Sequence, residues 1–198
     1  HLLEEGYPVG DIDAAMRRFG MPMGPFEVVD EVGLDVAMKV AEVLGRAFPQ
    51  RMAPAPVLAK MVEAGRLGKK SGRGFYRRDG RKRVPDDSVR PLLALPAERK
   101  PASLDALSER MAMAMINESA WCLEDRVVPD AGSGDLAMIF GTGFPPFRGG
   151  PLRYADALGL AAVVTRLRAL RAEKGERFEP CPGLVRRAEA GETFTQPV

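Results

Sequence analysis

The segment Gly24–Leu34, which reads GPFEVVDEVGL, recurs at Gly150–Leu160 as GPLRYADALGL. Gly, Pro, Asp, Gly and Leu occupy the same places in both segments, at a constant offset of 126 positions. Each segment is typical of a short helix, with Gly at the N-cap, Pro at the first helical position and Gly just after the last turn. Taken alone, the two segments predict two ordinary capped helices.

Three further blocks recur in the same order along the chain. The pairs are Asp13–Gly20 with Gly134–Gly141, His1–Glu5 with Trp121–Asp125, and Pro56–Gly65 with Pro182–Gly191. Four matched blocks in one order indicate a duplicated unit of about one small domain. We therefore predict a mostly α protein in which two repeated helical domains, residues 1–95 and 96–198, pack together.

Composition excludes several classes of protein. The 198 residues are enough for one large domain or for two small ones, each with a hydrophobic core. A net charge of +2 gives no global field that would attract nucleic acid. Two cysteines, Cys122 and Cys181, cannot form a disulfide framework, which favours a reduced, cytoplasmic setting. No apolar run is long enough to predict a membrane span.

The spacing of apolar residues and capping residues predicts most of the helices. His1–Gly6 reads as the end of a helix that begins earlier, so we expect a piece of a longer protein. The other expected helices run from Gly10 or Asp11 to Phe19, from Asp35 to about Phe48, over Pro56–Gly65, over Ser103–Arg126, over Asp135–Phe140 and over Leu160–Leu170. The helix over Ser103–Arg126 carries two apolar lanes and should be central. An extended connector is expected over Pro85–Pro101, and a polar loop over Glu173–Pro180.

One β-hairpin interrupts this helical pattern. Asp79-Gly80 within Phe75–Val84 is a two-residue turn signal. Residues 66–83 hold nine Lys or Arg, opposed only by Asp79. Charge runs are usually solvated surface, and that is the simpler interpretation. The alternative is an anion-binding patch for phosphate groups, with Arg77 and Arg78 as its candidates.

Residues that could carry catalysis are scarce. The only histidine is His1, and two separated cysteines supply no metal-ligand cluster. Glu27 and Asp30 share a helix face, where a dipole or capping role is a better interpretation than catalysis. No strand-turn-helix GxGxxG predicts a dinucleotide site, and Gly68–Gly74 lacks the spacing of a phosphate loop. We therefore expect no catalytic, cofactor or metal residues in this chain.

The segments Asp11–Met16, Gly20–Asp35 and Gly65–Tyr76 closely resemble the C-terminal domain of 3-hydroxyacyl-CoA dehydrogenases. Asp135–Pro151 resembles a second copy of that domain, as in the multifunctional proteins of fatty-acid β-oxidation. The resemblance implies a 6-phosphogluconate dehydrogenase C-terminal-like helical fold with one small hairpin near residues 75–84. It also implies NAD-dependent oxidation of an L-3-hydroxyacyl-CoA.

The same resemblance implies where the site residues lie. The family's catalytic His–Glu pair and its NAD site belong to a Rossmann domain that has no counterpart in this sequence. The hydratase domain of the multifunctional proteins and the substrate-side Asn of the family also have no counterpart here. The turn that resembles the wall facing the acyl thioester consists of Met21, Pro22, Met23, Gly24, Pro25 and Phe26. The second copy departs from it at Phe147–Leu152, which favours a packing role for that copy.

Two functions follow as expectations. The first is the substrate-cleft and assembly region of a 3-hydroxyacyl-CoA dehydrogenase, inactive alone, with acyl-CoA, its own Rossmann domain, and a homo-oligomer or thiolase-containing complex as partners. The alternative is a stand-alone, non-catalytic helical dimerisation or interaction module.

Overall fold

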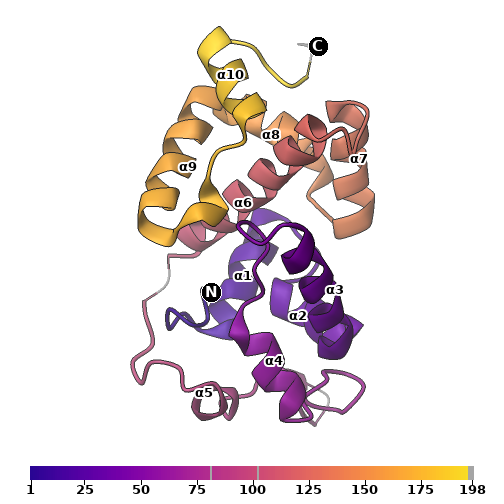
Figure 1. Ribbon diagram of the computed structural model, residues 1–198. Helices are drawn as coiled ribbons and strands as arrows, with labels where there is room; N and C mark the ends of the chain where they lie inside the picture. The colour runs from indigo at the N-terminus through magenta and orange to yellow at the C-terminus, as the bar shows by residue number, and fades with distance from the viewer. Residues whose placement is uncertain (81, 102, 196–198) are drawn as a thin grey trace. The chain divides into compact units, whose positions relative to one another are not determined.

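The computed structural model describes residues 1–80, 82–101 and 103–195, and it is mostly helical, as predicted (Figure 1). The chain divides into two compact units. The N-terminal unit comprises His1–Arg18 and Pro22–Ser108, and the C-terminal unit comprises Phe19–Met21 and Glu109–Val198.

The first half of the chain contains five helices and a hairpin among the described residues. They are α1 (Val9–Phe19), α2 (Pro25–Val32), α3 (Leu34–Ala47), α4 (Pro56–Glu63), β1 (Tyr76–Asp79), β2 (Lys82–Pro85) and α5 (Val89–Leu92). Helix α2 begins after Gly24, as its Gly-Pro signature predicts, and the Glu27 carboxylate accepts a hydrogen bond from the Gly24 N–H at 2.9 Å. Helix α3 packs on both α2 and α4.

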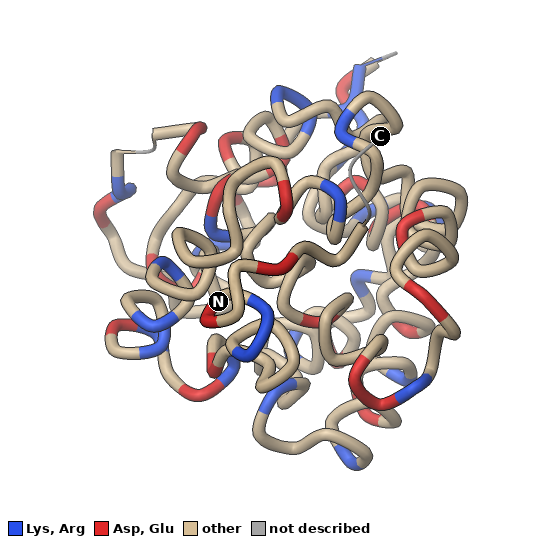
Figure 2. Tube along the Cα trace, turned by 90° about the horizontal axis from the view of Figure 1, so that it is seen from above, with Lys and Arg blue, Asp and Glu red and all other residues tan. Residues whose placement is uncertain are grey.

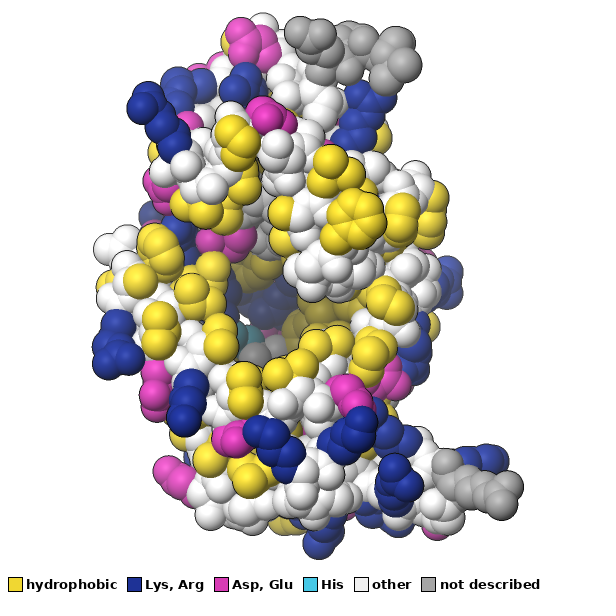
Figure 3. Space-filling model, turned by 90° about the vertical axis from the view of Figure 1, so that its right-hand side faces the viewer, with side chains coloured by type: hydrophobic (Ala, Val, Ile, Leu, Met, Phe, Trp, Pro, Cys, Tyr) yellow, Lys and Arg dark blue, Asp and Glu magenta, His cyan; other side chains and the backbone are white. Residues whose placement is uncertain are grey.

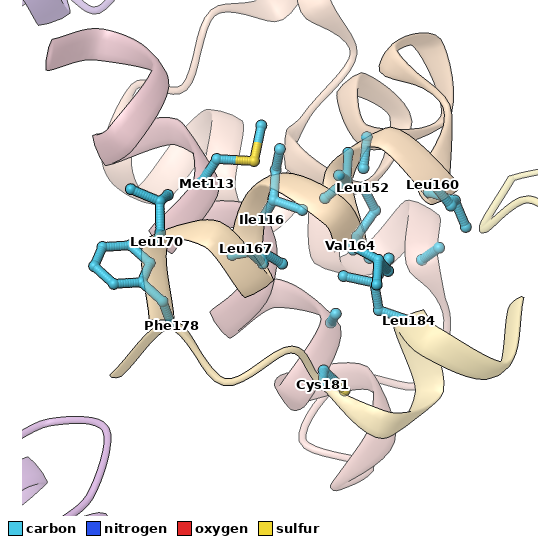
Figure 4. Packing of buried hydrophobic residues seen from close by; sticks show 14 residues of the cluster. Met113, Ile116, Leu152, Leu160, Val164, Leu167, Leu170, Phe178, Cys181 and Leu184 are labelled. Atoms are coloured by element: carbon cyan, nitrogen blue, oxygen red, sulfur yellow. The ribbon is translucent and has the colours of Figure 1, made fainter. Parts of the chain in front are cut away.

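The second half contains further helices around one core. They are α6 (Leu104–Glu124), α7 (Ala131–Thr142), the 3₁₀ turn η1 (Pro146–Arg148), α8 (Pro151–Leu158), α9 (Leu160–Lys174), the 3₁₀ turn η2 (Glu176–Phe178) and α10 (Pro182–Ala190). Figure 4 shows Val164 and Leu167 of α9 pointing towards Leu184 of α10 and Ile116 of α6. Helix α6 is buried on more than one side, as its two apolar lanes predict.

Several boundaries differ from the sequence prediction for local reasons. Helix α3 is capped by Gly33, because Asp35 lies inside the first turn and binds the Lys70 ammonium at 2.8 Å. Helix α7 starts four residues early, because the Asp130 carboxylate caps the Ser133 N–H at 2.8 Å. His1–Gly6 forms hydrogen-bonded turns.

Two segments expected to lack regular structure contain helices. The short helix α5 lies inside the expected connector, where Val89 is buried. Helix α9 extends into the expected polar loop, and Phe178 of the same loop is buried in the core.

The hairpin is confirmed, with a one-residue difference in its turn. Tyr76 pairs with Pro85, Arg78 with Arg83 and Asp79 with Lys82. Asp79 therefore lies in β1 and not in the turn, while Arg81 lies outside the described residues.

Charges of both signs are spread along the whole trace (Figure 2), which agrees with the small net charge. Within the described residues, no helix is both long enough and apolar enough to cross a membrane.

Candidate functional site

The predicted substrate-side turn is built around a close contact between Gly24 and Asp13. A Cβ on Gly24 would lie 2.2 Å from the Asp13 Cβ, so only glycine fits. Phe26 turns its ring onto Phe75, with ring centroids 4.5 Å apart. Pro22 and Pro25 are exposed, while Met21 and Met23 are half-buried. The turn is thus a rigid structural corner whose prolines face solvent.

Asp13 holds this corner in place from beneath. Its buried carboxylate accepts hydrogen bonds from the Phe26 N–H at 2.9 Å, the Glu27 N–H at 3.1 Å and the Tyr76 hydroxyl at 2.7 Å. The first two N–H groups belong to the open first turn of α2, which needs side-chain acceptors. One carboxylate therefore joins α1, α2 and β1.

Burial of this carboxylate changes its titration. Burial raises the pKa of Asp13 from 3.8 to about 6, although hydrogen bonds from Tyr76 and Phe26 act in the opposite direction. The pKa of the Tyr76 hydroxyl is also raised, first by burial and then by its bond to Asp13. The proton of Tyr76 thus stays in place at physiological pH.

Replacing Tyr76 by Phe is expected to raise the pKa of Asp13 further, because the variant loses a donor that stabilises the ionised carboxylate. The measurement is a pH titration of the Asp13 carboxyl carbon by ¹³C NMR. Tyr7→Phe is the control, since Tyr7 packs on Lys100 and leaves the pKa of Asp13 unchanged. An unchanged or lowered pKa in Tyr76→Phe would contradict the assignment.

The same shift gives the sign of a pH effect on stability. Between its ordinary pKa of 3.8 and the folded value of about 6, the folded chain binds more protons than the unfolded chain. The contribution of Asp13 to stability is therefore complete below pH 3.8 and declines as the pH rises through 6.

Asp30 is the second buried carboxylate of the N-terminal unit and is only 2% exposed. It accepts hydrogen bonds from the Phe75 and Tyr76 N–H groups, both at 2.9 Å. Arg83 approaches it at 3.4 Å. Asp30 therefore fixes the start of the hairpin against the end of α2.

The C-terminal unit repeats both carboxylates. Asp135 accepts from the Leu152 and Arg153 N–H groups at 2.7 and 2.9 Å, at the start of α8. Asp156 accepts from the Phe194 and Thr195 N–H groups at 2.8 and 2.9 Å. The pKa of Asp135 is raised by burial, as is that of Asp13. The sequence repeat is thus matched by equivalent bonds from aspartate carboxylates to pairs of backbone N–H groups.

A third acidic residue, Asp86, forms ion pairs with two arginines beside the hairpin. It binds Arg66 at 2.9 Å and Arg73 at 3.0 Å, and the Ser88 hydroxyl donates to it at 2.6 Å. Burial raises the pKa of Asp86, but the bonds from Ser88 and Arg66 outweigh burial and lower the pKa. This cluster ties the loop before β1 to the loop after β2.

None of these groups forms a catalytic constellation. Within the described residues, no three His, Cys, Asp or Glu side chains gather to hold a metal ion. His1 pairs with Glu4 on the surface at 2.9 Å. The pKa of the Cys181 thiol is raised by burial, which keeps the thiol protonated and unreactive.

A dipole or capping role is expected for Glu27 and Asp30, and only Glu27 has it, because Asp30 lies in the last turn of α2. Glu27 caps its own helix and pairs with Arg17. Asp30 binds backbone 45 residues away, which its helical spacing did not indicate. Nothing in the local sequence around Asp13 or Asp86 predicts their bonds. The recurrence of Asp13 as Asp135 inside the repeat was the signal that could have identified the first of them.

Comparison with known proteins identifies the family of this scaffold. The family described as "3-hydroxyacyl-CoA dehydrogenase, C-terminal domain" matches residues 1–78 and 107–196. The fold is similar to that of 3-hydroxybutyryl-CoA dehydrogenase from Escherichia coli K12, with 25% identity and a TM-score of 0.72 over 96% of this chain and 56% of that one. It is also similar to the dehydrogenase part of multifunctional enzyme 1 from C. elegans, with 24% identity and a TM-score of 0.70 over 93% of this chain and 43% of that one.

The chain therefore spans about half the length of these two solved structures. The family match covers both halves of the chain, on either side of the segment between residues 78 and 107. The chain belongs to the 3-hydroxyacyl-CoA dehydrogenase family and matches its C-terminal domain.

Proposed function

We propose that this chain is the substrate-cleft and assembly region of an NAD-dependent L-3-hydroxyacyl-CoA dehydrogenase of fatty-acid β-oxidation. The observation that carries the proposal is the family match over both halves of the chain. The sequence contains no GxGxxG motif that would hold a dinucleotide. NAD is accordingly bound by a separate Rossmann domain, and this chain alone is inactive.

Within this proposal the two copies have different roles. The first copy, residues 1–95, presents the turn Met21–Phe26 to the acyl thioester. Two observations favour this role. Asp13 holds the turn rigidly through its hydrogen bonds to Phe26 and Glu27, and Pro22 and Pro25 are exposed. The second copy, residues 96–198, has Phe147–Leu152 at the corresponding place and acts as a scaffold.

An exposed apolar stripe supports a role in assembly. It lies on α2, on α3 and on the residue that follows α3, and each of its side chains is more than a third exposed: Val28, Val32, Val36, Val40, Val43, Leu44 and Phe48. Exposed apolar side chains in such number on two neighbouring helices are typical of an interaction site. The stripe fits contact with the Rossmann domain, with a second copy or with a thiolase-containing complex. It also favours the second candidate function, a non-catalytic interaction module.

A cytoplasmic setting fits the two cysteines.

The test is a chimera that joins this chain to the part of the E. coli 3-hydroxybutyryl-CoA dehydrogenase that it does not match. We expect acetoacetyl-CoA-dependent NADH oxidation from the chimera and none from the chain alone. Met23→Glu in the chimera should lower kcat/KM by about tenfold or more, because the turn positions the substrate. Val127→Glu, at a residue 70% exposed, is the matched control and should have no effect.

Two results would count against the proposal. Turnover by the chain alone would refute its inactivity. A chimera that binds NADH and folds, yet shows no turnover, would favour the interaction module.

A further inference from the structure

The hairpin and the loop before it enclose a small pocket of about 190 Å³ in the N-terminal unit. We call it the hairpin pocket. Four of its lining residues are cationic, namely Lys69, Arg77, Arg78 and Arg83, and two are acidic, namely Asp30 and Glu31. Lys and Arg side chains gather in the lower right part of the face shown in Figure 3. The ionisable side chains that line the pocket thus sum to a net charge of +2.

The acidic groups of the pocket are already engaged. Asp30 accepts two backbone hydrogen bonds and lies 3.4 Å from Arg83. Glu31 pairs with Lys69 and lies 3.9 Å from Arg83. Within the described residues, Arg77 and Arg78 form no ion pair, and both are exposed. Two guanidinium groups of the pocket therefore remain without a counterion.

The strand register makes this surplus charge costly. Arg78 lies directly opposite Arg83 in the β1–β2 ladder, so both side chains leave the same face of the hairpin. Like charges directly opposite each other destabilise a sheet pair. Arg83 is held on this face by the Tyr76 ring, whose centroid lies 5.3 Å from its guanidinium carbon. A doubly charged anion between the two arginines would remove the repulsion.

We propose that the hairpin pocket binds a phosphate group, with Arg78 and Arg83 as its principal ligands and Lys69 and Arg77 at its rim. Guanidinium groups present planar pairs of N–H donors that match phosphate oxygens. A phosphate monoester carries nearly two negative charges at pH 7, which equals the surplus of the pocket.

A single nucleic-acid strand fits this pocket less well. Such a strand needs exposed aromatic rings on which bases stack. Tyr76 is buried and its hydroxyl is bonded to Asp13, while Phe75 is buried completely. The phosphate could instead belong to acyl-CoA, which carries a 3′-phosphate and a pyrophosphate, or to a separate phosphorylated molecule.

The test measures binding of inorganic pyrophosphate, CoA and dephospho-CoA to the whole chain by isothermal titration calorimetry. Arg78→Glu is the informative variant, because Arg78 has no partner in the described structure whose loss would unfold the unit. We expect it to weaken binding by about 10- to 100-fold, the effect of losing a charge-assisted hydrogen bond. Arg78→Lys should lose less affinity for the probes than Arg78→Glu. Arg46→Glu, the same charge change on exposed α3, is the control and should bind as wild type.

The outcomes show whether the pocket binds phosphate and which molecule supplies the phosphate. Tighter binding of CoA than of dephospho-CoA assigns the 3′-phosphate to the pocket, and equal binding assigns the pyrophosphate or a separate molecule. Equal losses in Arg78→Glu and Arg46→Glu, or no binding of any of the three probes, would overturn the proposal. The pyrophosphate arm does not depend on the proposed dehydrogenase role, so an inactive chimera would leave a positive result intact.

Discussion

Replacing Asp30 by Ala is expected to lower the free energy of unfolding of the N-terminal unit by about 3–5 kcal/mol. The change leaves the Phe75 and Tyr76 N–H groups buried without an acceptor, and it removes the nearest acid from Arg83. Each orphaned buried donor costs about 1–3 kcal/mol. The measurement is native-state hydrogen exchange of amides in α1 and β1, because two units need not unfold together.

Asp156→Ala supplies the matched control in the second copy. Asp156 also accepts two backbone hydrogen bonds, but it is only half-buried and holds a segment near the end of the described chain. We expect a loss of about 1 kcal/mol, the usual net value of exposed hydrogen bonds. Equal losses in the two variants would show that burial of Asp30 does not determine its contribution.

Replacing Gly24 by Ala is expected to cost about 3 kcal/mol, because the new Cβ overlaps Asp13 and the two helices must separate. The nearest atoms include the Asp13 Cα at 2.4 Å, which belongs to the backbone and cannot rotate away. Gly150→Ala meets Asp135 in the same way, at 2.3 Å, and it also carries a φ of +102°. The positive φ should add about 1–2 kcal/mol to its cost.

Urea unfolding followed by circular dichroism measures both variants. Gly141→Ala is the control, since a Cβ there meets nothing within 4 Å and the residue lies inside helix α7. Alanine should stabilise that helix by about 0.5–1 kcal/mol. A neutral result for Gly24→Ala would contradict the rigid corner described for the turn Met21–Phe26.

Local signals predicted most of the fold. Gly24-Pro25 and Gly150-Pro151 carry their own capping information, so the starts of α2 and α8 followed from three or four residues. The signal Asp79-Gly80 predicted the hairpin in the same way but placed its turn one residue too early, because Asp79 pairs with Lys82. Boundaries set by a neighbouring side chain, such as Asp130 at α7, were missed because propensity alone does not reveal which acid caps a helix.

The site itself was harder to predict from the sequence. The bond between Asp13 and Tyr76 joins residues 63 positions apart, and that between Asp30 and Phe75 joins residues 45 apart. Spacing within one helix carries no information on such partners. The repeat did carry information on which acids matter, because Asp13 and Asp30 both have counterparts in the second copy. The substrate role of Met21–Phe26 stays a prediction.

The paired carboxylates also explain how the two copies could change length independently. Asp13 and Asp135 lie 122 positions apart, whereas Asp30 and Asp156 lie 126 apart. Both members of each pair nevertheless bind two consecutive backbone N–H groups. The two aspartates are therefore 17 positions apart in the first copy and 21 apart in the second, so the segment between them differs in length while the bonds are kept. For protein engineering, the loop Gly143–Gly149 before α8 is therefore the place where a change of length has already been accommodated without loss of the bonds from Asp135.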